Sequence, residues 1–258
     1  MYQFFVEENQ FAGDRISILG SDVNHIKNVL RMKTGERVRV SLSYNGRSFF
    51  GIIDSITEDE VIVMIESEDE NGTELANRIY LFQGLPKGDK MELIIQKAVE
   101  LGVYEIIPVA MKNCVVKLDD KKAGSKVKRW QAISESAAKQ SKRTLVPEVQ
   151  MPMTWKEAMK KAQELDVVLV PYECERGMEA TREVIKAIQP GQSIAIFIGP
   201  EGGFAPDEIE GICPTNEGEG FSLGLEKKSH RISLGRRILR TETAGLATLS
   251  MLIFCLDE

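Results

Sequence analysis

Hydrophobic and polar positions alternate with a short period over the first 70 residues, and with a helical period after them. The short apolar runs predict strands at residues 2–6, 16–19, 37–44, 47–54 and 61–65. Between the third and fourth runs stands Asn45-Gly46, which favours a tight hairpin because both turn positions need positive φ. Five short strands in succession predict a small β-barrel.

One helical pattern interrupts these strands. Its apolar positions share one face of a helix over residues 21–30, and Ser21 is a candidate for its N-cap. An acidic run, Glu66 to Gly72, follows the last strand and ends in a turn pair, so we interpret it as a linker. The pattern therefore predicts a barrel domain over residues 1–70 and a second domain over residues 71–258.

The second domain alternates between strand and helix patterns. Strands are predicted at 79–82, 105–109, 167–170 and 193–198, and helices at 89–101, 127–140, 155–165, 178–188 and 238–254. This order is typical of a mostly parallel sheet with helices on both faces. The last helix is apolar nearly all round, so it must be covered on most sides, and a second subunit is one way to do that.

Composition narrows the classes of protein. The chain has 258 residues, of which 43% are hydrophobic, enough for a sizeable core. Its longest apolar run, 244–256, is too short for a bilayer, and no signal-peptide pattern opens the chain, so we expect a cytoplasmic protein without a membrane segment. The four cysteines and two histidines are scattered, which predicts reduced thiols and no metal site.

Charge is segregated along the chain. The net charge is -6, yet residues 112–143 carry ten Lys and Arg against three acidic residues, whereas residues 58–70 carry seven acidic residues and no basic one. A basic stretch of this kind is either a surface that contacts nucleic-acid phosphates or a solvated helix face.

The most informative loop follows the apolar run Ser193–Ile198. It reads Gly199-Pro200-Glu201-Gly202-Gly203 and precedes a helix start at Pro206, so it predicts a strand, a tight loop and a helix. Open α/β sheets bind ligands at such junctions. The loop lacks the spacing of a phosphate or dinucleotide site, and the carboxylate of Glu201 suits a neutral or cationic ligand. The alternative is that these glycines only serve a tight turn.

A second segment, Ser233-Leu234-Gly235 with Ile238 to Ala244, adds to this loop. Together with residues 85–92, 97–103 and 140–143, the two segments resemble the SPOUT (α/β-knot) methyltransferases, specifically the 16S ribosomal RNA uridine N3 methyltransferase family. The resemblance covers most of the chain. It implies an α/β fold class, with an N-terminal PUA- or OB-like barrel, a C-terminal SPOUT domain with a trefoil knot, and a homodimer formed through that domain.

The resemblance also implies the cofactor and its site. The cofactor is S-adenosyl-L-methionine, and three loops are expected to hold it: Val170, Pro171, Tyr172 and Glu173; Gly199, Pro200, Glu201, Gly202 and Gly203; and Leu234, Gly235, Ile238 and Leu239. Arg240 is the candidate for stabilising a deprotonated uracil, because an arginine stays charged. Its alternative role is a salt bridge at the helix end. Glu201, Glu242 and water remain open as proton acceptors.

The implied substrate is 16S ribosomal RNA of the small subunit, methylated at N3 of one uridine. Seven residues match RNA-contacting positions of the family: His25, Arg31, Lys87, Lys97, Lys139, Gln140 and Arg143. A lone histidine such as His25 is also often an ordinary hydrogen-bonded surface residue. The alternative function is a non-catalytic RNA-binding protein of ribosome assembly.

One stretch departs from the family pattern. Ser222-Leu223-Gly224 nearly repeats Ser233-Leu234-Gly235, with a charged segment between the copies. We assign the second copy to the cofactor site because it leads directly into Ile238-Leu239-Arg240.

Overall fold

The computed structural model describes residues 1–43, 45–70, 72–173, 175, 177–214, 225 and 228–257. Contacts divide the chain into two compact units, one of residues 1–74 with 135–146 and one of residues 75–134 with 147–258. The repeated Ser222-Leu223-Gly224 lies outside the described residues.

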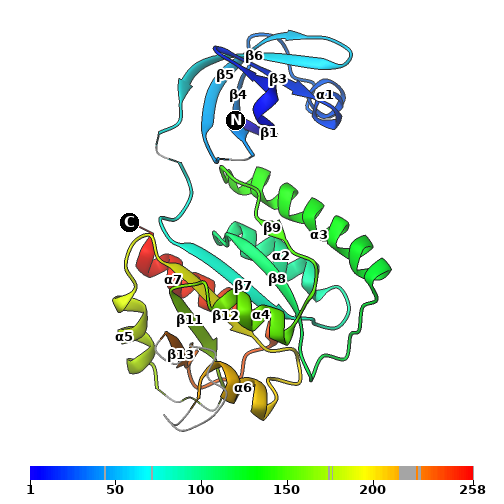
Figure 1. Cartoon of the computed structure of the whole chain (residues 1–258). Coiled ribbons are helices and arrows are strands. Elements are labelled where there is room, and N and C mark those ends of the chain that lie inside the picture. The colour runs from blue at the N-terminus through cyan, green and yellow to red at the C-terminus, as the bar shows by residue number, and fades with distance from the viewer. Residues whose placement is uncertain are drawn as a thin grey trace. The chain divides into compact units, whose positions relative to one another are not determined.

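The first unit is built on one six-stranded sheet (Figure 1). Its elements are β1 (Tyr2–Val6), the 3-10 turn η1 (Glu8–Gln10), β2 (Phe11–Ala12), β3 (Arg15–Leu19), α1 (Ser21–Asn24), the π-helical turn η2 (His25–Val29), β4 (Arg37–Leu42), β5 (Ser48–Ile56) and β6 (Glu60–Glu68). The strand order is β1-β4-β5-β6-β3-β2, antiparallel except for the β1–β4 pair. Strand β1 also contacts β3, so the sheet curls toward closure.

Alternate residues of these strands bury a continuous apolar core that includes Ile16, Val38 and Ile53, all fully buried. The hairpin predicted at Asn45-Gly46 is confirmed, since β4 and β5 pair antiparallel around it and Gly46 has a φ of 71°. The N-cap prediction is wrong. Ser21 is the first residue of α1, the cap position is Gly20, and no side chain bonds to the helix end.

The linker predicted over Glu66 to Gly72 is also wrong in part, because Glu66–Glu68 form the end of β6. Arginines of the same sheet pair with these carboxylates. Arg37 Nη2, in β4, lies 2.6 Å from a Glu66 carboxylate oxygen, and Arg47 Nε, in the turn before β5, lies 2.6 Å from one of Glu68. The buried Arg39 of β4 pairs with Asp69. Acidic residues can extend a strand when cations of the same sheet pair with them.

The second unit contains a parallel sheet with helices on both faces, as predicted (Figure 1). Its elements are β7 (Arg78–Gly84), α2 (Lys90–Glu100), β8 (Glu105–Ala110), α3 (Asp120–Ser141, whose last turns belong to the first unit), β9 (Glu148–Val149), β10 (Met153–Thr154), α4 (Trp155–Ala162), β11 (Val167–Pro171), α5 (Glu179–Ala187), β12 (Ser193–Ile198), α6 (Pro206–Ile212), β13 (Ser229–Ile232) and α7 (Thr241–Leu256). The strand order is β10-β8-β7-β12-β11-β13, with β9 beside β8. Each of these neighbouring strand pairs, formed by described residues, is parallel.

Successive side chains of the central strands point to opposite faces of the sheet and pack against different helices. On one face, the rings of Phe82 and Phe197 stack with 4.3 Å between centroids, and Phe197 contacts the edge of Trp155 at the start of α4. On the other face, Gly245 of α7 packs close to Ile198 and Leu81. These central strands are buried on both faces, which explains their nearly continuous apolar sequences. The predicted α/β fold class with an N-terminal β-unit is confirmed, and the trefoil knot stays a prediction.

Helix α7 begins three residues later than the apolar pattern predicts. Arg240 has an extended backbone (φ -68°, ψ 155°) and occupies the N-cap position, so Ile238 and Leu239 lie in the preceding loop. No helix among the described residues is long and apolar enough to cross a membrane.

Candidate functional site

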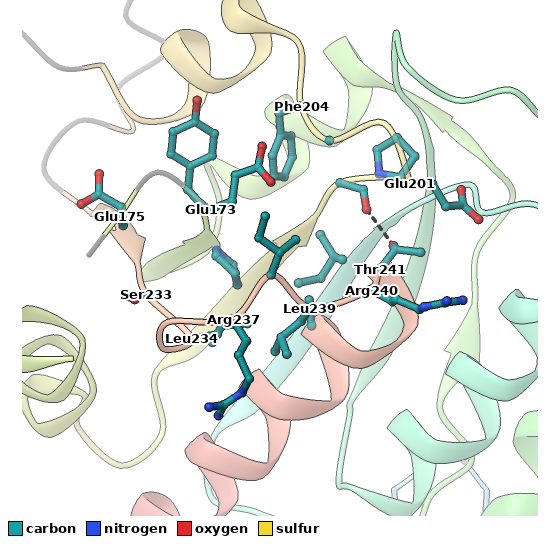
Figure 2. Close-up of a pocket in the computed structure, with 18 of the residues that line it drawn as sticks. Glu173, Glu175, Glu201, Phe204, Ser233, Leu234, Arg237, Leu239, Arg240 and Thr241 are labelled. Atoms are coloured by element: carbon teal, nitrogen blue, oxygen red, sulfur yellow. Dashed lines mark hydrogen bonds between the residues drawn. The ribbon is translucent and has the colours of Figure 1, made fainter. Parts of the chain in front are cut away.

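A pocket of about 450 Å³ lies where the carboxyl ends of β11 and β12 meet the start of α7. Figure 2 shows the loops that surround it. The lining consists of Lys90, Pro171, Tyr172, Glu173, Glu175, residues 198–204, residues 233–241 and Ala244. Its volume is in the range of small-molecule sites, and its place at the carboxyl ends of parallel strands is where such folds bind ligands.

The glycine loop has a shape that side chains would disturb. A Cβ on Gly199 would stand 3.2 Å from the Gly203 carbonyl carbon and from the Phe204 nitrogen, and Gly203 has a φ of 68°. The Gly203 N–H donates to the Pro200 carbonyl at 2.9 Å, which closes the turn. Asn113 Nδ2 donates to the carbonyls of Gly202 and Gly203 at 3.1 and 3.2 Å. The loop is therefore held from inside and from the segment after β8.

A buried hydrogen-bond relay ties this loop to α7. Thr241 Oγ1 donates to the Gly199 carbonyl at 2.7 Å, as the dashed line in Figure 2 shows, and it accepts from Gln83 Nε2 at 2.9 Å. Gln83 is fully buried in β7, and its Oε1 has no hydrogen-bond partner among the described residues. The relay fixes the direction of the Gly199 carbonyl from the interior of the sheet.

The remaining wall comes from the segment between β13 and α7. Thr181 of α5 holds its start, because its Oγ1 accepts from the Ser233 N–H at 2.9 Å. Gly235 then turns the chain with a φ of 103°, a conformation that favours glycine. Leu234, Ile238 and Leu239 add apolar surface to the pocket, and Ile238 is 82% exposed. This segment supplies an apolar wall next to the polar glycine loop.

Charged groups cluster at one end of the pocket. Lys90 Nζ lies 2.9 Å from Glu201 Oε1 and 3.3 Å from Glu242 Oε2. Burial raises the pKa of Glu201, but the hydrogen bonds and the charge of Lys90 outweigh it, so this pKa lies below the ordinary value of 4.5. A carboxylate with a lowered pKa is a weaker base. The side chain of Arg240 is exposed and forms no hydrogen bond or ion pair with the described part of the chain.

The structure brings the predicted cofactor residues together with one exception. Pro171, Tyr172, Glu173, the residues 199–203, Leu234, Gly235, Ile238, Leu239 and Arg240 all line the pocket. Val170 is fully buried within β11 and does not. The sequence analysis assigned the attraction for a cationic ligand to Glu201, but this carboxylate is paired with Lys90. The other acidic groups that line the pocket are Glu173 and Glu175, on the opposite wall (Figure 2).

Three contributors were missed by the sequence reasoning: Lys90, Gln83 and Thr241. Lys90 stands in the stretch 85–92 and Thr241 directly follows Arg240, so both lie within segments already singled out. For Gln83, a polar residue at the end of an otherwise apolar strand was the available signal.

The predicted RNA-contacting residues differ in accessibility. His25, Arg31, Lys87 and Gln140 are exposed, whereas Lys97 is half-buried and paired with Glu100 at 2.8 Å. Lys139 pairs with Asp22 at 3.0 Å and with Glu135 at 2.9 Å. The side chain of Arg143 is 4% exposed and pairs with Glu74, whose carboxylate also accepts from the Thr144 N–H at 2.8 Å. Arg143 is thus placed to hold the first unit together.

No group of three or more His, Cys, Asp or Glu side chains in the described ranges is arranged to hold a metal ion. The thiols of Cys114 and Cys213 are free and buried, and Cys255 is free and exposed. Burial raises the pKa of Cys114 and of Cys213, which makes both thiols poor nucleophiles.

The fold and the pocket define the class of protein. A model of the family described as RNA methyltransferase domain matches residues 73–253, and one described as RNA methyltransferase PUA domain matches residues 18–66. The class is therefore that of the RNA methyltransferases with an N-terminal PUA domain.

Relatives narrow this class. The Bacillus subtilis protein named ribosomal RNA small subunit methyltransferase E is 36% identical over 98% of this chain and 96% of its own length. The protein of that name from Mesomycoplasma hyopneumoniae is 33% identical over 98% of this chain and 99% of its own. A crystal structure of the Neisseria gonorrhoeae enzyme of that name, bound to S-adenosyl methionine, has a TM-score of 0.78 at 28% identity, covering 98% of this chain and 97% of that one. This chain belongs to the ribosomal RNA small subunit methyltransferase E family, which confirms the resemblance.

Proposed function

We propose that this protein methylates N3 of a uridine in 16S ribosomal RNA, with S-adenosyl-L-methionine as the methyl donor. The observation that carries the proposal is the pocket itself. In a chain of this family, three loops from distant parts of the sequence surround one cavity. Arg240 is exposed at its edge and has no partner among the described residues.

The residues present fit this cofactor. The pocket offers backbone groups in the glycine loop for the edges of adenine and ribose, an apolar wall from Leu234 and Leu239, and the carboxylates of Glu173 and Glu175 for a cationic ligand. When bound, the cofactor supplies an activated methyl group on a sulfonium. The protein then has to orient the acceptor base and exclude water, and orientation can contribute roughly 7 to 11 kcal/mol to catalysis.

Arg240 is proposed to stabilise the uracil anion. N3 of a neutral uracil bears a proton, so its lone pair becomes available only after that proton leaves. A guanidinium next to the base favours the anion electrostatically. Arg240 has no ion-pair partner in the described chain, which argues against the alternative role of a helix-end salt bridge. Glu201 is disfavoured as the proton acceptor because its pKa is lowered.

RNA recognition is proposed to use exposed cations of both units, with residues 1–70 as the RNA-recognition domain and residues 71–258 as the methyltransferase domain. His25, Arg31 and Lys87 are accessible as they stand, and Gln140 lies exposed near the end of α3. Lys97 and Lys139 would have to exchange a carboxylate for a phosphate. Arg143 is the weakest of these assignments because its pair with Glu74 is almost inaccessible.

We further propose a homodimer formed through the C-terminal domain, a trefoil knot in that domain and a cytoplasmic location, where small ribosomal subunits are assembled. Helix α7 supports the dimer, since Phe254 is 90% exposed, and Ala247 and Met251 on the same face of the helix are only partly buried. An exposed patch of adjoining apolar side chains is typical of an interface.

The test is methyl transfer from labelled S-adenosylmethionine to 16S ribosomal RNA, given either free or within small subunits. Nucleoside mass spectrometry should detect N3-methyluridine with the parent protein and much less with Arg240→Ala. Binding of both cofactor and RNA without any methyl transfer would refute the proposal and favour a non-catalytic assembly protein. Methylation of another base position would refute the uridine N3 assignment alone.

A further inference from the structure

A single ammonium group joins three segments at the polar end of the pocket. Lys90, at the start of α2, contacts Glu201 of the glycine loop at 2.9 Å and Glu242 of the first turn of α7 at 3.3 Å. The Lys87 N–H also donates to Glu201 Oε1 at 3.1 Å. Among the described residues, Lys90 is therefore the cationic partner of both Glu201 and Glu242, which follow it by more than a hundred residues in the sequence.

The Glu242 carboxylate is incompletely satisfied. Its Oε2 is buried and receives no aligned hydrogen bond within the described chain, although Lys90 Nζ is close enough for an ion pair. A carboxylate with free acceptor capacity attracts any nearby guanidinium, because charge-assisted and bidentate pairs are the strong ones. Arg240 stands two residues before Glu242 and lines the same pocket as Glu201. Arg240 nevertheless makes no ion pair with the described residues.

We infer that Lys90 is a positioning residue: by holding Glu201 and Glu242, it keeps both carboxylates off Arg240 and leaves the guanidinium available to the acceptor base. This inference rests on the proposed function for the role of Arg240, but the contacts of Lys90 stand without it. The hydrogen bond that Lys90 donates to Glu201 raises the pKa of Lys90, so the ammonium stays charged over the working pH range. Without Lys90, Arg240 would take its place, because it is the arginine of this segment nearest to Glu242 in the sequence.

The rate of chemical modification of Arg240 shows whether its guanidinium is paired with a carboxylate, and its measurement needs no methyl transfer. Arginine-selective dicarbonyl reagents attack the neutral guanidine, so a new carboxylate partner slows the modification. Cleavage after glutamate places Arg240 on one peptide, residues 227–242, together with Arg236 and Arg237, which are exposed and serve as internal references. Mass spectrometry of this peptide gives the rate at Arg240 relative to both.

In Lys90→Met the relative rate at Arg240 should fall by about tenfold, because a guanidinium paired with a carboxylate gives up its proton less readily. Lys90→Arg should keep the parent rate, and adding Glu201→Gln and Glu242→Gln to Lys90→Met should restore it. An unchanged rate in Lys90→Met overturns the inference. Lys90 is 31% exposed, so the fold should tolerate the change, and Lys90→Gln gives the same reading if the methionine variant aggregates.

Kinetics provide the second test. Lys90→Met should lower kcat by about tenfold in the parent background and have no further effect in Arg240→Ala, because the inference makes Lys90 act through Arg240. Additive losses would overturn it and indicate that Lys90 acts on the substrate or cofactor directly. If the parent protein methylates no RNA, the proposed function fails, and the modification rates still decide the role of Lys90.

Discussion

Replacing Thr241 by Val tests how the glycine loop is held. Valine keeps the shape of threonine but removes the hydroxyl that donates to the Gly199 carbonyl at 2.7 Å and accepts from Gln83 Nε2 at 2.9 Å. Thr241 is 6% exposed, so water does not readily replace both bonds. Within the part of the chain that the structure describes, Gln83 then keeps its 3.0 Å bond to the Gly84 carbonyl and no other side-chain hydrogen bond.

The expected magnitude follows from these bonds. A buried polar group left without a partner costs about 1–3 kcal/mol, and the half-buried Gly199 carbonyl recovers part of that from water. We expect the free energy of unfolding to fall by about 2 kcal/mol. Because the Gly199 carbonyl then loses its fixed direction, we also expect the affinity for S-adenosylmethionine to fall about tenfold, or about 1.4 kcal/mol.

Two variants serve as matched controls. Thr248→Val removes a fully buried hydroxyl of the same helix, but that hydroxyl bonds only to the Ala244 carbonyl at 2.8 Å, within α7. Thr241→Ser retains the hydroxyl. Denaturant unfolding gives the stability, and calorimetry gives the affinity. The reasoning is refuted if Thr241→Val binds cofactor as tightly as the parent and loses no more stability than Thr248→Val.

Three further outcomes are expected. Gly199→Val should abolish cofactor binding in calorimetry, because its Cβ stands 3.2 Å from the backbone of Gly203 and Phe204; Gly124→Ala, with no atom near its Cβ, should bind normally. Arg143→Ala should lower the free energy of unfolding by about 3 kcal/mol by leaving Glu74 unpaired, whereas the exposed Lys122→Ala should change it by less than about 0.5 kcal/mol. Burial lowers the pKa of His230 from 6.5, so the unfolded chain takes up that proton first and stability should fall as the pH drops below about 6.5, a dependence that His230→Gln should reduce.

For each of these three predictions, a specific result would contradict the assignment behind it. Cofactor binding by Gly199→Val at parent affinity would remove the glycine loop from the site. A stable Arg143→Ala with a lower salt dependence of RNA binding would return Arg143 to the RNA surface. An unchanged pH dependence of unfolding in His230→Gln would show that other groups cause it.

The sequence by itself determined most element positions, because strand and helix periods are local properties. The runs at 2–6 and 193–198 coincide with β1 and β12. Element ends were less certain, since they depend on distant partners. Glu66–Glu68 extend β6 because arginines of the same sheet face them, and Ile238 and Leu239 stay outside α7 because Thr241 is bonded to Gly199.

The loops of the pocket were also visible in the sequence, through their glycines and the family motifs. Only the tertiary structure decided which of their charges are already paired. Lys90 pairs with Glu201 and Glu242, Arg143 pairs with Glu74, and Arg240 has no ion-pair partner in the described chain. The physical reason is that ion pairing depends on distances across the fold, between residues as far apart as 90 and 242, which no local pattern encodes.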